Sequence, residues 1–169
     1  MHDSMTQGSY SNIKTSVKRI GVISDTHGLV RPQALEALRG VDLIIHAGDI
    51  GKPEVIDAIE SIAPVIAIKG NNDIGLWAKR LPSIQSIQFG EAKLYVIHSL
   101  KDLKFDPLAR GYHAVISGHS HKPVALSRDG VLFVNPGSAG PRRFRLPVAV
   151  ARLSVSGKRV KAEIIELAI

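Results

Sequence analysis

Residues 19–27 of this 169-residue chain read RIGVISDTH, a short apolar run that ends in an aspartate and a histidine. Four further runs rich in apolar residues are also followed directly by polar ones, at 43–47, 65–69, 94–97 and 114–117. Short buried strands with polar residues just after them are typical of α/β proteins, whose sites lie at the carboxyl ends of strands. We therefore expect the five loops to converge on one site.

The remaining pattern predicts two helices and three hairpins. Segments 32–39 and 53–62 are amphipathic, and each opens with a proline suited to the first helical turn. The hairpins are expected at 84–89 with 93–98, 124–127 with 131–135, and 148–155 with 159–166. The sequence thus predicts two packed sheets with helices outside, in a single domain over residues 18–169, preceded by a flexible polar extension at residues 1–17.

Composition limits the function classes. Hydrophobic residues make up 44% of the chain and charged residues 22%, which is ordinary for a soluble globular protein. There is no cysteine, so a metal must be held by carboxylate, imidazole, amide or water, a ligand set suited to Mn²⁺, Mg²⁺, Fe or Zn. No apolar run approaches the roughly 20 residues of a membrane span, and the start lacks a signal-peptide core. We expect a cytoplasmic enzyme with no membrane partner.

Positive charge is concentrated in the last part of the chain. Residues 1–100 hold 10 Lys or Arg and 10 Asp or Glu, whereas residues 101–169 hold 12 and 5. Arg142 and Arg143 follow the turn at 135–138 and could attract the phosphate of a substrate. A solvated surface is an equally good explanation for any one of these arginines.

The polar residues after the strands supply ligands for two metal ions. Asp25 and His27 are separated by one residue and can hold one ion, and His119 and His121 repeat that spacing. Asp49 is expected to bridge two ions, since a carboxylate has two oxygens. Asn71 offers a neutral amide oxygen, although its segment also has strong turn composition. His98 could equally be a hydrogen-bonded structural residue.

Two ions about 3.5–4 Å apart activate a water and clamp both oxygens of an in-line phosphoryl displacement. This chemistry suits the ligand set. The sequence has no serine nucleophile elbow, P-loop or dinucleotide-binding glycine motif, so covalent acyl chemistry, nucleotide-triphosphate switching and hydride transfer lack support.

The chain resembles the calcineurin-like metallophosphoesterases, and within them the small single-domain YfcE-like phosphodiesterases. The resemblance runs from about residue 19 to the C-terminus and rests on motifs in the family's order: Asp25-x-His27, His46-x-Gly48-Asp49, Gly70-Asn71-Asn72-Asp73, His98, Gly118-His119-x-His121 and Asn135-Pro136-Gly137-Ser138. It implies a four-layer α/β/β/α sandwich with two mixed sheets. It also implies two divalent ions, most commonly Mn²⁺, with Ni²⁺, Fe²⁺, Zn²⁺ or Mg²⁺ as alternatives.

The resemblance also distributes the ligands between the two ions. One ion would take Asp25, His27, Asp49 and His121, and the other would take Asp49, Asn71, His98 and His119. His46 would lie behind the ligands, and we interpret it as a core histidine with satisfied hydrogen bonds. Asp49, Asn71, Asp73 and His98 are the expected catalytic residues, and Asn72, Arg142 and Arg143 the expected substrate contacts.

Two departures from the family pattern affect the mechanism. Larger phosphatases have a histidine after the metal-binding asparagine, where it assists the leaving group, but this chain has Asn72 followed by Asp73. The missing proton donor favours diesters or substrates with good leaving groups, with Asp73 as a stand-in acid or a structural residue. Ser99 replaces the glycine that usually follows the metal-binding histidine, which changes the local backbone preference.

The resulting hypothesis is a metal-dependent phosphodiesterase that hydrolyses small phosphodiesters through a water or hydroxide bridging two ions. A phosphomonoesterase would use the same site. A third alternative is a non-catalytic protein-binding scaffold, the role of relatives in retromer coats that have lost metal-site histidines. Nucleic-acid binding ranks low because aromatic residues are few. A homo-oligomer is left open.

Overall fold

The computed structural model describes residues 19–169 and contains two five-stranded sheets. Sheet A has the strand order β10-β9-β1-β2-β3. Strands β1, β2 and β3 are parallel, whereas β9 is antiparallel to β1 and to β10. The bounds of its strands are β1 Arg19–Ile23, β2 Leu43–His46, β3 Val65–Ala67, β9 Ala149–Ser156 and β10 Arg159–Glu166.

Sheet B has the strand order β4-β5-β6-β8-β7. Its central strands β5, β6 and β8 are parallel, and β4 and β7 join them as antiparallel edge strands. The bounds are β4 Ile84–Phe89, β5 Ala92–Ile97, β6 Ala114–Ile116, β7 Val124–Arg128 and β8 Val131–Asn135. Both sheets are therefore mixed, as the sequence predicts.

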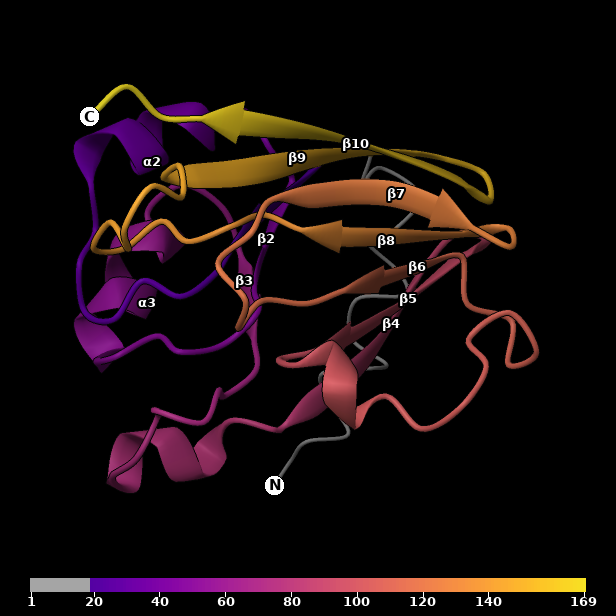
Figure 1. Cartoon of the computed structure of the whole chain (residues 1–169), viewed down its shortest axis with the longest axis horizontal. Coiled ribbons are helices and arrows are strands. Elements are labelled where there is room, and N and C mark those ends of the chain that lie inside the picture. Colours follow the sequence, from indigo (N-terminus) through magenta and orange to yellow (C-terminus); the bar gives the residue numbers. More distant parts are fainter. Residues whose placement is uncertain (1–18) are drawn as a thin grey trace.

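The main core lies between the two sheets, which pack face to face (Figure 1). Ile20 and Val22 of sheet A and Leu94 and Val96 of sheet B belong to this buried cluster. Helices α2 (Pro32–Ala37) and α3 (Pro53–Glu60) cover the other face of sheet A, and their apolar side chains share a second cluster with strand residues of that sheet. Alternation of side chains along each strand thus gives sheet A two buried faces.

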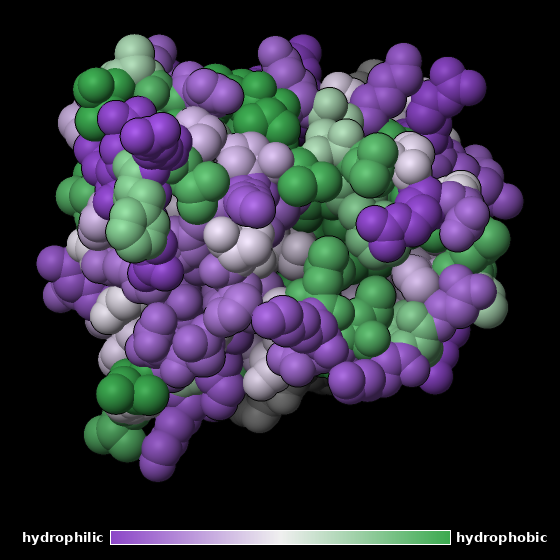
Figure 2. Space-filling view, in the orientation of Figure 1, coloured by the Kyte–Doolittle hydropathy of each residue, from purple (hydrophilic) through white to green (hydrophobic). Residues whose placement is uncertain are grey.

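The outer face of sheet B is covered by the 3-10 helix η2 (Leu100–Asp102) and the loop after it rather than by an α-helix. Phe105 and Tyr112 from this segment pack on Tyr95 of β5, at centroid distances of 5.0 and 5.1 Å. Coverage is partial, and hydrophobic side chains gather over sheet B on the face seen in Figure 2. Leu100, Leu108 and Leu126 are among the exposed leucines.

Both predicted helices form, but each ends two residues early. Gly40 follows α2 with φ +86°, a left-handed conformation that stops a helix. After α3, Pro64 disfavours a helical backbone at Ala63. All three predicted hairpins are present. Two short 3-10 helices were not predicted: η1 (Leu76–Arg80) and η2.

The predicted extension at residues 1–17 lies outside the described residues. Within residues 19–169, no helix is both long and apolar enough to cross a membrane.

Candidate metal centre

The predicted ligands follow the carboxyl ends of parallel strands, as the sequence predicts. Asp25 and His27 follow β1, Asp49 follows β2, His98 follows β5, and His119 and His121 follow β6. Backbone hydrogen bonds fix neighbouring loops together: Asp25 N–H donates to Gly48 O at 3.0 Å, and His27 N–H donates to Asp49 O at 3.0 Å. The loops are thus held in register before any ligand binds.

Five of the predicted ligands have a left-handed backbone. The φ angles are +55° at Asp25, +47° at His27, +58° at Asp49, +71° at His119 and +65° at His121. Among residues 19–169, only two other non-glycine residues have positive φ, at Asp129 and Phe144. Each such conformation costs about 1 kcal/mol and persists only where surrounding contacts impose it. The concentration of left-handed, non-glycine residues at the predicted ligands indicates a functional site.

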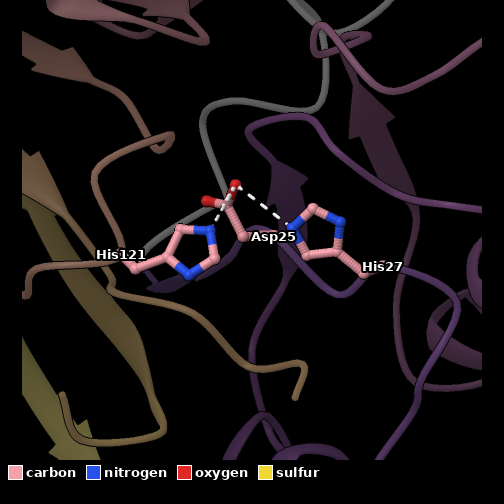
Figure 3. A group of neighbouring side chains, drawn as sticks. All are labelled: Asp25, His27 and His121. Atoms are coloured by element: carbon pink, nitrogen blue, oxygen red, sulfur yellow. Dashed lines mark ion pairs between the residues drawn. The ribbon is translucent and has the colours of Figure 1, made fainter. Parts of the chain in front are cut away.

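The first ligand cluster consists of Asp25, His27 and His121 (Figure 3). Asp25 Oδ1 lies 3.9 Å from His27 Nε2 and 3.4 Å from His121 Nε2, and the two imidazole rings are 5.5 Å apart. The Asp25 side chain is fully buried and that of His27 is 23% exposed. The cluster therefore has one face open to a substrate.

The second cluster consists of Asp25, Asp49 and His98. His98 Nε2 lies 3.4 Å from Asp49 Oδ2 and 3.9 Å from Asp25 Oδ1. Asp49 Oδ2 is also 3.8 Å from His27 Nε2, so this oxygen lies between histidines of both clusters. That position suits a bridging carboxylate. Asp25, however, is the residue that belongs to both three-residue groups.

Three of the donor atoms that face one another have no hydrogen-bond partner: Asp25 Oδ1, His27 Nε2 and His98 Nε2. The remaining buried side-chain atom without a partner within the described residues is His121 Nδ1, the ring nitrogen other than the one facing Asp25. Buried polar atoms are almost always paired in native proteins, so such a group requires an explanation. Carboxylate and imidazole donors at these separations fit a divalent metal ion.

The other oxygen of Asp25 is already occupied. Ser24 Oγ donates to Oδ2 at 2.7 Å, and the backbone N–H of His119 donates to it at 3.0 Å. These bonds orient the carboxylate so that Oδ1 faces the histidines. Burial nevertheless raises the pKa of Asp25, because a low-dielectric environment disfavours its charged form.

Asp49 and His98 stabilise each other's charged forms. Burial alone would raise the pKa of Asp49, but the nearby His98 Nε2 at 3.4 Å and the hydrogen bond from the Asn72 backbone hold that pKa below the usual range. Burial likewise opposes charge on His98, yet its contacts with Asp49 and Ala47 O raise its pKa. His98 Nδ1–H donates to Ala47 O at 2.7 Å, so in the neutral imidazole Nε2 is free as a metal donor.

His46 has satisfied hydrogen bonds, in agreement with its interpretation as a core residue. Gly48 N–H donates to its Nδ1 at 3.1 Å, so Nε2 carries the proton and bonds Thr26 Oγ1 at 2.9 Å. Thr26 Oγ1 in turn donates to Ile50 O at 2.9 Å. Complete burial lowers the pKa of His46 to about 3, so it is neutral near pH 7. Thr26 was not predicted to take part.

Asp73 joins the loops after β2 and β3. Its Oδ2 accepts hydrogen bonds from Ile50 N–H at 3.1 Å and Gly70 N–H at 2.8 Å, and its Oδ1 accepts one from Gly51 N–H at 2.9 Å. It is only 6% exposed. These contacts suit the structural alternative for Asp73, and its predicted catalytic role stays a prediction.

Asn72 contacts Asp49 twice. Its backbone N–H donates to Oδ1 at 2.9 Å and its side-chain amide donates to Oδ2 at 3.1 Å. The amide is therefore bonded to a predicted metal ligand, and its own predicted contact with substrate stays a prediction.

Glycines allow the loops to approach the ligands. A Cβ at Gly118 would meet Ser24 Oγ and lie 2.7 Å from Asp25 Oδ2, and one at Gly70 would meet Asp49 Oδ1. Larger residues there would displace the carboxylates. In the sequence, the need for a small residue at Gly70 and Gly118 is indicated only by the motifs to which these glycines belong.

The turn at 135–138 holds the loop after β6 and the loop after β1. Asn135 Nδ2 donates to Gly118 O at 2.9 Å, and Ser138 Oγ donates to Asp25 O at 2.9 Å. The sequence motif at 135–138 gave no indication of a role for either side chain. Both act as supports of the ligand loops.

The remaining predicted residues lie around the two clusters. Asn71 and His119 line a cleft together with His98, and the rings of His98 and His119 are 5.2 Å apart. Arg142 and Arg143 are exposed in the loop before β9. Burial and the positive charge of Arg143 lower the pKa of His121, against the opposing effect of Asp25, so that arginine lies near enough to act on the first cluster.

Comparison with known proteins agrees with this geometry. Residues 19–158 match the model of the calcineurin-like phosphoesterase superfamily domain. A probable metallophosphoesterase of Methanothermobacter thermautotrophicus is 36% identical over 157 residues, covering 86% of this chain and 91% of that protein.

Solved structures share the fold. A novel archaeal phosphodiesterase aligns with a TM-score of 0.72 at 28% identity, covering 87% of this chain and 99% of the other. Vacuolar protein sorting 29 of Cryptosporidium parvum aligns with a TM-score of 0.76 at 18% identity, covering 90% of this chain and 92% of the other. Because the family's domain model matches most of the length of this chain, the chain belongs to the calcineurin-like phosphoesterase superfamily.

Proposed function

We propose that this protein is a metal-dependent phosphodiesterase that hydrolyses small phosphodiesters. The observation that carries the proposal is the set of unpartnered donor atoms on Asp25, His27 and His98, which face one another in a buried site. Relatives described as metallophosphoesterase and phosphodiesterase support the same reaction class.

The predicted ligands would hold two divalent ions, with Mn²⁺ as the expected metal and Asp49 as the residue shared by both ions. Bound ions would supply a nucleophilic water and neutralise charge on the phosphate. Asn72 binds Asp49 through two hydrogen bonds and thereby orients it. Asp25 is oriented by Ser24 and the His119 backbone. The chain's own contribution is to fix these carboxylates before substrate arrives.

Diester preference follows from the residue after Asn71. An asparagine amide has no proton to give up near neutral pH, so Asn72 cannot act as a general acid. The leaving group must then depart as a stable anion or be protonated by solvent. This favours diesters with good leaving groups.

Phosphomonoesters are the second candidate substrates, and one observation favours them. Arg143 acts electrostatically on His121, so a cation lies close to the first cluster. A dianionic monoester would gain more from that charge than a monoanionic diester. The scaffold alternative is disfavoured because every predicted ligand position is filled.

The test is hydrolysis of bis(p-nitrophenyl) phosphate and p-nitrophenyl phosphate by metal-stripped protein with and without Mn²⁺. We expect Mn²⁺-dependent turnover of the diester that exceeds turnover of the monoester. Asp57→Asn, an exposed change on α3, is the matched control for Asp49→Asn. Faster monoester turnover would favour the second candidate, and no turnover with Mn²⁺, Ni²⁺, Zn²⁺ or Mg²⁺ would favour the scaffold.

A further inference from the structure

A cleft adjoins the metal centre on the side of His98 and His119. Its volume is about 640 Å³, within the roughly 300–1,000 Å³ of small-molecule sites. Asn71, His98 and His119 are among its lining residues, so a molecule in the cleft would contact predicted metal ligands. Two other clefts on the molecule, of about 290 and 130 Å³, contain none of the predicted ligands.

The cleft continues past the ligands onto the outer face of sheet B. Ile84 and Ile97 are paired across β4 and β5 and line it, and Ile84 is 47% exposed. Tyr95 lies beside Ile97 in the same lining. These side chains give the outer part an apolar wall, suited to a sugar or base rather than to another phosphate.

Two lysines reach this cleft from different sheets. Lys69 follows β3 of sheet A and directly precedes the loop that carries Asn71, whereas Lys101 belongs to η2 beside sheet B. Within residues 19–169 neither ammonium group has an ion-pair partner. Asp102 is the one acidic residue of the lining outside the metal centre, so the cleft carries a net positive charge.

Metal ions at the ligand clusters would already neutralise the scissile phosphate. Lysines beyond the clusters are therefore free for a second anion on the same molecule, and an ammonium is a common partner for phosphate. We propose that the cleft binds one arm of the diester, that this arm carries a second phosphate, and that Lys69 and Lys101 bind that phosphate. The proposal rests on the phosphodiesterase function proposed above and names its substrate class.

Two chromogenic diesters test the proposal, thymidine 5′-(p-nitrophenyl phosphate) and its 3′-phosphorylated analogue. Both lose p-nitrophenolate from the same bond, so they differ only in the second phosphate. With Mn²⁺-loaded full-length protein we expect kcat/KM to be about tenfold higher for the phosphorylated substrate, since each exposed charge pair contributes up to about fivefold. In the Lys69→Gln/Lys101→Gln double variant the ratio of the two values should fall to about 1.

Lys158→Gln, at the exposed β9–β10 turn, is the control, and should keep the wild-type ratio. A second readout does not depend on turnover. In calorimetry, thymidine 3′,5′-bisphosphate should bind wild-type protein more tightly than thymidine 5′-phosphate does, and the double variant should lose that difference.

The outcomes separate this inference from the function on which it rests. Diester turnover with no effect of the 3′-phosphate, or an effect that survives in the double variant, overturns the cleft assignment and leaves the phosphodiesterase intact. If neither diester is hydrolysed with any ion but the lysine-dependent binding difference is found, the cleft stands as an anion site and the proposed reaction fails.

Discussion

Replacing Asp73 by asparagine tests whether one buried carboxylate holds two ligand loops together. Asparagine keeps one acceptor oxygen, which can still serve Ile50 and Gly70, but its NH₂ group would face the N–H of Gly51. One hydrogen bond is lost outright, and the other two lose their charge assistance. A charged bond is worth about 1.5–3 kcal/mol and a neutral one about 0.5–1.5, so the lost bond costs about 2 kcal/mol and each weakened bond about 1. We therefore expect a loss of about 4 kcal/mol in the free energy of unfolding.

The assay is urea unfolding of metal-free protein, with Mn²⁺ titration by calorimetry on the same samples. A loss of this size lowers Tm by roughly 8–16 °C in a domain of this length. Because the loops of Asp49 and Asn71 are released from each other, Mn²⁺ affinity should fall about 10–100-fold, as for other residues that support metal ligands. Activity should be reduced but present.

Asp57→Asn removes the same charge from an exposed position on α3 and should leave both measurements unchanged. If Asp73→Asn matched that control in stability and Mn²⁺ affinity while losing all turnover, the supporting role would be refuted. Asp73 would then be the missing general acid.

Asp49→Asn should reduce diester turnover to background with the fold intact by circular dichroism, because Asp49 lies between both ligand clusters; retained turnover would remove it from the site. Gly118→Ala should destabilise the protein by about 1–3 kcal/mol in urea unfolding, since the new Cβ meets Ser24 Oγ, and adding Ser24→Ala should recover part of that loss. The pKa of His46 is about 3 in the folded chain and about 6.5 in the unfolded chain, so its contribution to stability is complete above pH 6.5 and is lost as pH falls towards 3. Between pH 6.5 and 5 the wild type should lose about 2 kcal/mol more than His46→Gln in the same unfolding assay. Arg143→Gln should raise KM for the diester about threefold with little change in kcat, and an unchanged KM would place that arginine outside the substrate site.

Strand positions were predictable because apolar runs are a local signal, and the candidate ligands were predictable because they directly follow those runs. Runs of Val and Ile define β1 and β2, and the polar residues directly after them lie at the candidate metal centre. Parallel strands bring such residues to one edge of each sheet whatever their side chains, and the packing of the two sheets then brings the two edges together.

The supporting contacts were not predictable in the same way. Nothing near Ser138 in the sequence indicates a hydrogen bond to Asp25 O, 113 positions away. The three N–H groups that bind Asp73 come from two loops, and only their geometry distinguishes support from acid catalysis. The cleft with Lys69 and Lys101 likewise needs η2 to lie beside β5 in its lining, and η2 itself has no strong sequence signal.

The ligands of one cluster come from both sheets. Asp25 follows a strand of sheet A and His121 one of sheet B, and Asp25 Oδ2 already bonds the His119 backbone 94 positions along the chain. An ion held by Asp25 and His121 would therefore act as a cross-link that closes a loop of about 100 residues, which restricts the unfolded chain by about 4–5 kcal/mol in the loop-closure model. In a protein without cysteine, metal loading would then do for the pair of sheets what a long-range disulfide does elsewhere, and chelation would loosen one sheet from the other.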